Sequence, residues 1–214
     1  MNESTPHTIS RDEWLHIHNR AAQEYTNSAW FRETVVGTAR LRKQAFASAR
    51  GTILDVACGD GENFAVLPAA SPIVGVDFSP VMLELARERM RRLGRPIELH
   101  QMDAEALDFP DAHFDTVVSA LATCSFLDPI AALREMRRVC RPGGQILLLE
   151  HGRSQWAWLG RYQDRTAAQM IERGGCRWNQ EPQDLIRAAG LRIVTARRSH
   201  LGVFHVIHAV PAQA

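Results

Sequence analysis

Short apolar runs alternate with segments of helical periodicity along most of this chain. Runs rich in β-branched and aliphatic residues occupy 52–57, 72–77, 96–101, 114–119 and 144–150. Apolar residues recur at helical spacing in the segments between some of these runs, at 62–69, 80–92 and 129–141. Because alternating strands and helices build parallel sheets with helices on both faces, the pattern predicts a doubly wound, Rossmann-like α/β fold.

Turn-forming residues lie where this pattern needs them. Ser79-Pro80 predicts a helix start, because serine is a good N-cap and proline is favoured at the first helical position. Arg141-Pro142-Gly143-Gly144 predicts the end of the third helix and a turn into the fifth strand. Ligands of such sheets bind beyond the carboxyl ends of the strands, so the functional residues are expected there.

The C-terminal part departs from the alternation. Residues 182–189 have helical spacing, Gly190 ends them, and two alternating apolar runs follow at 191–198 and 203–210. The four residues 199–202 that join these runs are few enough for an antiparallel hairpin. The predicted sheet is therefore mostly parallel with a C-terminal antiparallel hairpin.

The N-terminal part indicates helices. Residues 10–48 have helical character, with Ser10 and Glu13 spaced for a capping box and a second helical stretch at 30–47. We therefore expect a helical cap over residues 1–50.

The remaining residues, 51–214, predict a single ligand-binding domain. Residues 151–181 are rich in Trp, Arg and Gly, and we expect them to form an irregular, inserted lid.

Composition and charge limit the function. The chain has 214 residues, of which 45% are hydrophobic and 23% charged, as in a globular domain with a full core. A net charge of +1 gives no pull toward nucleic acid, so no nucleic-acid partner is expected. No apolar run reaches the roughly 18 residues of a membrane span, and the polar first ten residues do not resemble a secretory signal. A cytoplasmic location is the expectation.

Cysteine and histidine spacing gives no metal signature. The four cysteines form no C-x-x-C pair, so we expect reduced thiols and no metal site: Cys58, Cys124, Cys140 and Cys176. The pairs His16-x-His18 and His205-x-x-His208 are expected on the surface and in a strand rather than as ligands.

The clearest indication of a ligand lies where the first strand ends. Small residues let a ligand approach the backbone there, at Ala57, Gly59 and Gly61. Asp55 and Asp60 place negative charge beside this turn. Asp77 ends the next strand, 22 residues after Asp55, which is close to the spacing at which a carboxylate binds a ribose. These residues predict an adenosine-containing cofactor.

Five ordered segments resemble class I S-adenosylmethionine (SAM) dependent methyltransferases. They are LDVACGDG (54–61), GVDFSPVML (75–83), DAEALDFPD (103–111), FDTVVS (114–119) and RPGGQIL (141–147). The resemblance covers roughly residues 50–210 and is nearest to the ubiquinone- and menaquinone-biosynthesis type. Ala57 stands where that family usually has glycine, a small enough change to leave cofactor binding intact.

A narrower resemblance lies downstream. LATCS (121–125), LEH (149–151) and GGCRWN (174–179) resemble thiol S-methyltransferase-like and bacterial phospholipid N-methyltransferase-like proteins. A cofactor reading as NAD is disfavoured, because Phe64 stands where a third glycine is needed. The ammonium and sulfonium of SAM also suit a carboxylate such as Asp55 better than a pyrophosphate would.

The resemblance implies how SAM is held. The residues implied around its methionine and ribose parts are Asp55, Ala57, Cys58, Gly59, Gly61 and Asn63. Asp77 would accept both ribose hydroxyls. Phe78 and Met82 would flank the adenine, although their apolar side chains fit a core equally well.

Further cofactor contacts follow from the same resemblance. Asp103 would accept from the adenine amino group, and Ala104 would offer its backbone N–H to the ring. Ser119 and Ala120 would face the methionine part through backbone groups, and Tyr25 would close over the cofactor.

Three residues are candidates for the chemistry. His151 follows the fifth strand, so it is placed either to take a proton from the acceptor or to hydrogen-bond the backbone. Cys124 is a candidate acceptor contact, and an inert core cysteine is the alternative. Trp156 is a candidate wall of an acceptor pocket, together with Trp158, Tyr162 and Trp178. These aromatics could equally cover the sheet edge or contact a membrane surface.

The lack of an evident His–Asp pair favours an acceptor that needs little general base. A thiol or an amine meets this condition, because a thiol has a pKa of about 8.5 that nearby positive charge lowers. We therefore predict a small-molecule methyltransferase that uses SAM and releases S-adenosylhomocysteine. The alternatives are a quinone or phospholipid acceptor, which would require peripheral membrane contact, and a SAM-binding protein without transfer activity.

Overall fold

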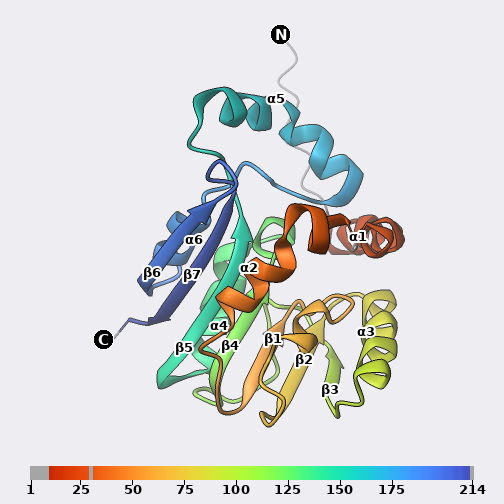
Figure 1. Cartoon of the computed structure of the whole chain (residues 1–214), viewed down its shortest axis with the longest axis vertical. Helices are drawn as coiled ribbons and strands as arrows, with labels where there is room; N and C mark the ends of the chain where they lie inside the picture. The colour runs from red at the N-terminus through yellow and green to blue at the C-terminus, as the bar shows by residue number, and fades with distance from the viewer. Residues whose placement is uncertain (1–9, 29–30, 213–214) are drawn as a thin grey trace.

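A seven-stranded sheet forms the centre of the molecule (Figure 1). The computed structural model describes residues 10–28 and 31–212. The strands lie in the order β3-β2-β1-β4-β5-β7-β6, and their bounds are β1 Ile53–Val56, β2 Ile73–Asp77, β3 Glu98–Gln101, β4 Phe114–Ala120, β5 Cys140–His151, β6 Leu191–Ser199 and β7 Phe204–Pro211. Strands β1 to β5 are parallel, and β7 is antiparallel to both β5 and β6. The predicted sheet with its C-terminal hairpin is confirmed.

Helices cover both faces of this sheet. Their bounds are α1 Arg11–Asn27, α2 Thr38–Ala45, α3 Pro80–Leu93, α4 Pro129–Val139, α5 Ala157–Gly174 and α6 Pro182–Ala188. A short π-helix, η1 (Phe31–Val36), and two 3₁₀ turns, η2 (Glu62–Ala65) and η3 (Thr123–Ser125), complete the described elements.

Side chains that alternate along the strands pack into two hydrophobic cores, one on each face of the sheet. Leu54 and Leu148 point to one face, where they pack with residues of α4 and α6. Ile53 and Leu147 point to the other face and pack with residues of α2 and α3. Because both faces are buried, the central strands are apolar throughout, which explains why they appear in the sequence as continuous runs.

Side chains fix the helix starts that the sequence predicts. The Ser79 hydroxyl accepts from the Met82 N–H at 3.2 Å, with Pro80 as the first residue of α3. The Ser10 hydroxyl accepts from the Glu13 N–H at 3.2 Å and so caps α1. Both caps satisfy N–H groups that a helix leaves unpaired.

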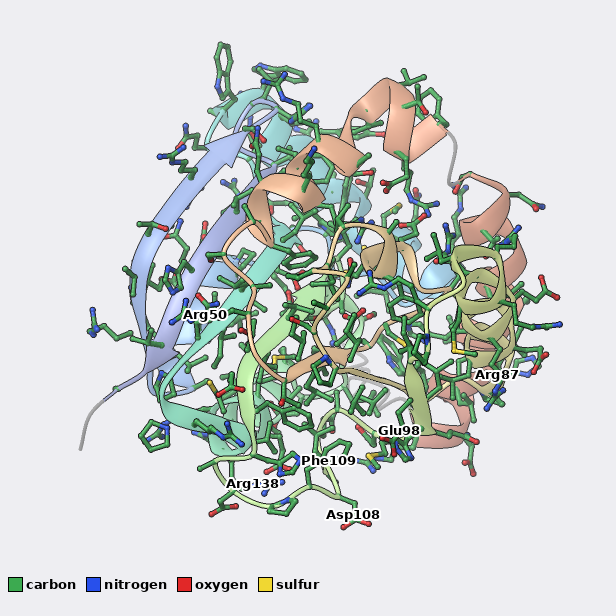
Figure 2. All side chains as sticks on the ribbon, turned by 60° about the horizontal axis from the view of Figure 1, so that its bottom comes forward. Arg50, Arg87, Glu98, Asp108, Phe109 and Arg138 are labelled. Atoms are coloured by element: carbon green, nitrogen blue, oxygen red, sulfur yellow. The ribbon has the colours of Figure 1, made fainter. Side chains whose placement is uncertain are left out.

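An arginine holds the loop between β3 and β4. Arg138, from α4, donates to the carbonyl oxygens of Leu107 and Phe109, each at 2.7 Å, and pairs with Asp111 at 2.8 Å. Figure 2 labels Arg138, Phe109 and Asp108 at this edge of the molecule. The loop that begins at Asp103 is therefore anchored at its far end.

Several predicted elements differ in extent. Residues 62–69 were expected to be helical, but only a single 3₁₀ turn, η2, forms there. The helix predicted at 129–141 ends at Val139, because β5 already pairs with β4 at Cys140. The segment 151–181 is not irregular: it contains the 18-residue helix α5. Its position as a lid stays a prediction.

The helices α1 and α5 lie beyond the carboxyl ends of the strands (Figure 1). They pack against each other, and α1 also contacts α3. Trp14 of α1 donates its indole N–H to the Ser125 carbonyl at 2.6 Å, and the Arg177 guanidinium lies 4.9 Å from the Trp14 ring centre. Helix α1 therefore lies over the edge of the sheet at which ligands of such sheets bind. Among the described helices, none has the length and apolar character to cross a bilayer.

Candidate functional site

Two adjoining cavities lie at the carboxyl ends of the strands. The larger, of about 440 Å³, is bounded by the turn after β1, the ends of β2, β4 and β5, and parts of α1, α2 and α5. The smaller, of about 130 Å³, lies between α1 and residues 102–105. Ala57, Asp77 and Phe78 line both, so the cavities meet beside the end of β2. Their size suits a small ligand.

The turn after β1 depends on backbone conformations that favour glycine. Ala57, Gly59 and Gly61 have φ angles of 53°, 56° and 81°. A Cβ at Gly61 would lie 2.4 Å from the Phe64 ring, whereas one at Gly59 would meet nothing within 4 Å. Gly61 is therefore needed for the tight turn over Phe64, and Gly59 leaves open space at the cavity wall.

Asp77 joins this turn to the start of α3. Its Oδ2 accepts from the Gly59 N–H and its Oδ1 from the Ser79 N–H, both at 2.9 Å. Burial raises the pKa of Asp77 to about 6, although these backbone hydrogen bonds act in the opposite direction. Its carboxylate lines both cavities, where the sequence places the ribose.

Asp55 lies behind the cavity wall rather than on it. Its Oδ1 accepts from the Asn63 side-chain amide at 2.7 Å, and Asn63 lines the larger cavity. Its Oδ2 is buried and has no hydrogen-bond partner among the described residues. Burial raises the pKa of Asp55 to about 7.

A buried arginine supports Asn63 from α2. Arg42 donates to Asn63 Oδ1 at 2.5 Å and pairs with Glu62 at 2.6 Å and Glu33 at 3.1 Å. Arg32 also pairs with Glu62, at 3.1 Å. Burial raises the pKa of Glu62, and Arg42 opposes this shift.

Sequence analysis predicted Asn63 but missed the ion pairs of Arg42 and Arg32 around it. Glu62 directly follows the glycine turn and could have been noticed, but nothing in the sequence relates Arg42 or Arg32 to it. Asp60 was expected to add charge at the turn, and it is instead paired with Arg89 at 2.7 Å.

The smaller cavity contains the residues predicted at the adenine. Asp103 and Ala104 line it, and Met82 lines the larger cavity near Phe78. Asp103 Oδ2 pairs with Arg11 of α1 at 2.7 Å, and Oδ1 accepts from the Glu105 N–H at 2.9 Å. The sequence gave no sign that Arg11 would reach this carboxylate.

Some of the other predicted cofactor residues line a cavity and others do not. Ala120 and Cys58 line the larger cavity, and burial raises the pKa of Cys58. Ser119 lines neither cavity, because its hydroxyl donates to the Val56 carbonyl at 2.9 Å and joins β4 to β1. Tyr25 lies on α1, but its side chain is outside the described part of the chain.

Three chain segments bring sulfur and imidazole together on the wall of the larger cavity. His151 Nε2 lies 3.1 Å from Cys124 Sγ and 3.4 Å from Cys176 Sγ. All three residues line the cavity. Cys176, which was not predicted as a site residue, follows α5, and Cys124 lies in η3. The three residues are too far apart in the sequence to show metal-ligand spacing, so sequence analysis did not predict this cluster.

The cluster has unusual acid–base properties. Hydrogen bonding with Cys124 and His151 lowers the pKa of the Cys176 thiol to about 5, against the effect of burial. Burial lowers the pKa of His151, but its hydrogen bond and charge interaction with Cys176 outweigh this and raise it. Burial raises the pKa of the neighbouring Glu150 to about 7, and Glu150 accepts from the Thr123 hydroxyl at 2.8 Å.

His18 is a further residue of the cavity wall. It was expected on the surface, but its Nδ1 lies 2.8 Å from the Trp14 carbonyl oxygen and its Nε2 is buried without a hydrogen-bond partner among the described residues. Burial lowers the pKa of His18.

Trp156, by contrast, is not brought to the cavities. It is the N-cap residue of α5, lines neither cavity and is 50% exposed. Trp158 and Tyr162 of α5 are similarly exposed, at 56% and 54%. Tyr162 contacts Trp178 edge to face at 5.8 Å.

The residues of the two cavities fit an adenosine-containing cation. A buried carboxylate oxygen without a partner stands behind the turn, Gly59 leaves room at the wall, and Asp77 presents a carboxylate between the cavities. Asp103 and Ala104 line the adjoining cavity, where the resemblance predicts the adenine.

Comparison with known proteins agrees with this geometry. Residues 54–148, from β1 to β5, match the family described as the methyltransferase domain. The match covers 95 of the 214 residues, and it supports placing this region among the class I SAM-dependent methyltransferases. The resemblance to class I methyltransferases and the expected cofactor, SAM, are therefore confirmed at the level of the family.

Curated relatives extend the match beyond this domain. The mitochondrial methyltransferase OMS1 of Saccharomyces cerevisiae is 28% identical over 94% of this chain and 47% of the relative. The phosphatidylethanolamine N-methyltransferase of Cereibacter sphaeroides is 41% identical over 52% of this chain and 57% of the relative. The chain thus spans about half the length of these relatives.

A solved structure confirms the fold. A SAM-dependent methyltransferase from Thermotoga maritima superposes with a TM-score of 0.69 at 24% identity, covering 92% of this chain and 99% of that one. The expected cytoplasmic location stays a prediction, since the name of the yeast relative places that protein in mitochondria.

Proposed function

We propose that this chain transfers a methyl group from SAM to a small-molecule acceptor, a thiol or an amine. The observation that carries the choice of acceptor is the position of Cys124, His151 and Cys176 on the wall of the cofactor cavity. Bound SAM supplies a methyl group on a sulfonium, which is already a good leaving group.

The protein contributes position and shelter. The turn after β1 and Asp77 would fix the cofactor, and α1 and α5 would exclude water from the reacting atoms. Holding two reactants in line can contribute roughly 7–11 kcal/mol to lowering the barrier.

The state of His151 supports an acceptor that needs little general base. Its Nε2 is within 3.4 Å of two sulfur atoms, so this nitrogen is already engaged. A phenol or carbon acceptor requires a dedicated base, whereas a thiol beside a sulfonium loses its proton readily. This favours a thiol or an amine over a phenol or a quinol.

A phospholipid acceptor is the second candidate, because α5 carries exposed aromatic side chains. Trp156 and Trp158 are half exposed, and such side chains are favoured at membrane interfaces. The match to a phosphatidylethanolamine N-methyltransferase supports the same reading. Binding of the chain to vesicles of phosphatidylethanolamine, lost on Trp156→Ala with Trp158→Ala, would favour it. Val194→Ala, which shortens an exposed apolar residue of β6, is the control.

The test is S-adenosylhomocysteine release from SAM across small thiols, amines, phenols, a quinol precursor and phosphatidylethanolamine vesicles. Turnover with thiols or amines supports the proposal, and turnover confined to a quinol or phospholipid overturns the choice of acceptor. Mass spectrometry of nucleotide that copurifies with the chain checks the cofactor separately. SAM or S-adenosylhomocysteine bound without turnover on any acceptor would favour a non-catalytic SAM-binding protein, and NAD would overturn the cofactor assignment.

A further inference from the structure

Three residues from distant parts of the chain place soft metal ligands within a few ångströms of one another. The Sγ atoms of Cys124 and Cys176 and an imidazole nitrogen of His151 all lie within 4.8 Å of each other. Cys124 lies in η3, His151 ends β5, and Cys176 follows the C-cap residue of α5. Among the described residues, no other set of three His, Cys, Asp or Glu side chains brings its ligand atoms together in this way.

The surrounding backbone holds these ligands in place. The Arg177 N–H donates to the Cys124 carbonyl at 3.0 Å, which ties the residue after Cys176 to η3. Gly175 has a φ of 66°, and a Cβ there would lie 2.4 Å from the His18 ring, so glycine allows the end of α5 to approach α1. The cluster is therefore built by packing rather than by a mobile surface loop.

We propose that Cys124, His151 and Cys176 bind one zinc ion whose fourth coordination position is open to the cofactor cavity. Tetrahedral zinc with Zn–S bonds of about 2.3 Å and Zn–N bonds of about 2.0–2.1 Å separates sulfur from nitrogen by about 3.5 Å. The two observed separations from His151 Nε2, 3.1 and 3.4 Å, differ from this by a few tenths of an ångström.

The ligand set and its position favour zinc with an open site. Two thiolates and an imidazole are ligands that zinc prefers, and their combined charge with Zn²⁺ is zero, which suits a partly buried place. Zinc sites with three protein ligands leave the fourth position to water or substrate. Because all three residues line the larger cavity, that position faces the space where an acceptor would enter.

The site would select a thiol as the acceptor, a role that rests on the proposed function. A thiol entering the fourth position would bind as a thiolate, its sulfur replacing a water molecule and its proton leaving to solvent. Binding thus produces the nucleophilic form without a histidine base. The metal site itself does not depend on this role.

Metal content of the full chain tests the site directly. Protein reduced with a phosphine, freed of metal by a chelator and then equilibrated with zinc should retain about one zinc per chain. Cys176→Ser and His151→Ala should each weaken zinc binding by more than the roughly 10- to 100-fold that loss of an outer-shell partner costs. Cys140→Ser, at a buried free cysteine of β5 outside the cluster, should leave zinc binding unchanged. Equal zinc binding by Cys176→Ser and the unaltered chain overturns the proposal.

Cobalt reports the geometry and the open position. Co²⁺ bound at the site should give thiolate-to-metal charge-transfer bands and intense tetrahedral d–d bands that Cys176→Ser loses. A small thiol added without SAM should shift these bands, which shows that it enters the fourth position. Cobalt spectra without thiolate bands, or a Cys124–Cys176 disulfide that persists through reduction, contradict the metal site. S-adenosylhomocysteine release with thiols by the metal-free chain would overturn the role of zinc while leaving the proposed methyltransferase function intact.

Discussion

The side-chain amide of Asn63 donates to Asp55 at 2.7 Å, and Arg42 donates to the same Asn63 side chain from the opposite side at 2.5 Å. A carboxylate at the end of β1 is thus linked through a cavity-lining amide to a cation of α2. Because Asp55 does not itself line the cavity, its charge acts on a ligand through Asn63 and across a short distance. This relay makes the ionisation of Asp55 a determinant of both stability and cofactor binding.

The first prediction concerns pH. Burial raises the pKa of Asp55 from 3.8 to about 7 and that of Asp77 from 3.8 to about 6. The protonated carboxyls therefore favour folding, and this contribution is complete below pH 3.8 and lost as the pH rises through 6 to 7. Cationic SAM favours the ionised carboxylates, so its affinity should increase from pH 6 to pH 8. Calorimetric titration and thermal unfolding across this range measure the two trends.

Asp55→Asn should separate these trends. At pH 8 the apo variant should unfold at a higher temperature than the unaltered chain, because no buried charge remains. The variant should bind SAM about 10-fold more weakly, the equivalent of roughly 1.5 kcal/mol for one charge-assisted interaction. Asp108→Asn, at an exposed residue outside both cavities, is the control (Figure 2). A variant that is less stable and binds SAM normally would contradict this account.

The second prediction concerns Asp77. Asp77→Asn replaces one of the two oxygens that accept from the Gly59 and Ser79 N–H groups by an amide, which leaves a buried donor unpaired. The free energy of unfolding should fall by about 1–3 kcal/mol, and SAM binding should weaken by more than 10-fold. Asp128→Asn is a control for the loss of charge alone, because Asp128 accepts from two backbone N–H groups through the single oxygen Oδ1, each at 3.0 Å, and lines neither cavity. Urea unfolding and SAM titration of both variants should show the binding defect in Asp77→Asn alone.

The third prediction concerns the buried ion pairs of Arg42. Arg42→Met should lower the free energy of unfolding by about 3–5 kcal/mol, because it leaves Glu62 buried with less compensation. Adding Glu62→Gln should restore part of this loss. Arg87→Met removes an exposed pair with Glu84, at 3.1 Å, and should change stability by less than about 1 kcal/mol. Similar denaturation midpoints for Arg42→Met and Arg87→Met would show that the buried network does not stabilise the fold.

The fourth prediction concerns Ala57. Its φ of 53° is in the left-handed region, which costs an L-residue roughly 1–2 kcal/mol. Ala57→Gly removes this strain, but it also lowers the free energy of unfolding by about 0.4–1 kcal/mol because glycine gives the unfolded chain more freedom. The variant should therefore be equally stable or more stable by up to about 1.6 kcal/mol, with SAM binding retained. Ala131→Gly, inside α4, should instead be destabilising by about 0.5–1 kcal/mol. A clear loss of stability in Ala57→Gly would show that the methyl group of Ala57 packs favourably.

Local sequence was sufficient for the half of the site that lies on the sheet. Strand β1, its small-residue turn and the carboxylate at the end of β2 each lie within a short contiguous segment, so local sequence is enough to predict them. Parallel pairing of β1 with β2 places Val56 beside Val76, which brings the turn and Asp77 together. Several predicted cofactor residues on these strand ends therefore line the cavities, whereas Asp55, Gly61 and Ser119 line neither.

Contacts made by α1, α2 and α5 were not predictable in the same way. Arg42 to Glu62, Arg11 to Asp103 and the approach of Cys176 to His151 join residues 20 or more positions apart. No periodicity or turn residue specifies how a surface helix docks across the ends of a sheet. The Trp, Arg and Gly content of residues 151–181 predicted an irregular segment, yet the regular helix α5 occupies 157–174 and ends at the Gly175 cap.

The sequence by itself determined the alternation of strands and helices, the C-terminal hairpin, the cofactor turn and the resemblance to the methyltransferase family, because strand periodicity, glycine conformation and strand-end carboxylates act over a few neighbouring residues. The tertiary structure alone decided which side chains close the cavity and that Cys124, His151 and Cys176 meet. Those contacts depend on how three helices pack over the carboxyl edge of the sheet, and packing of distant surfaces is set by their combined shape rather than by any local signal.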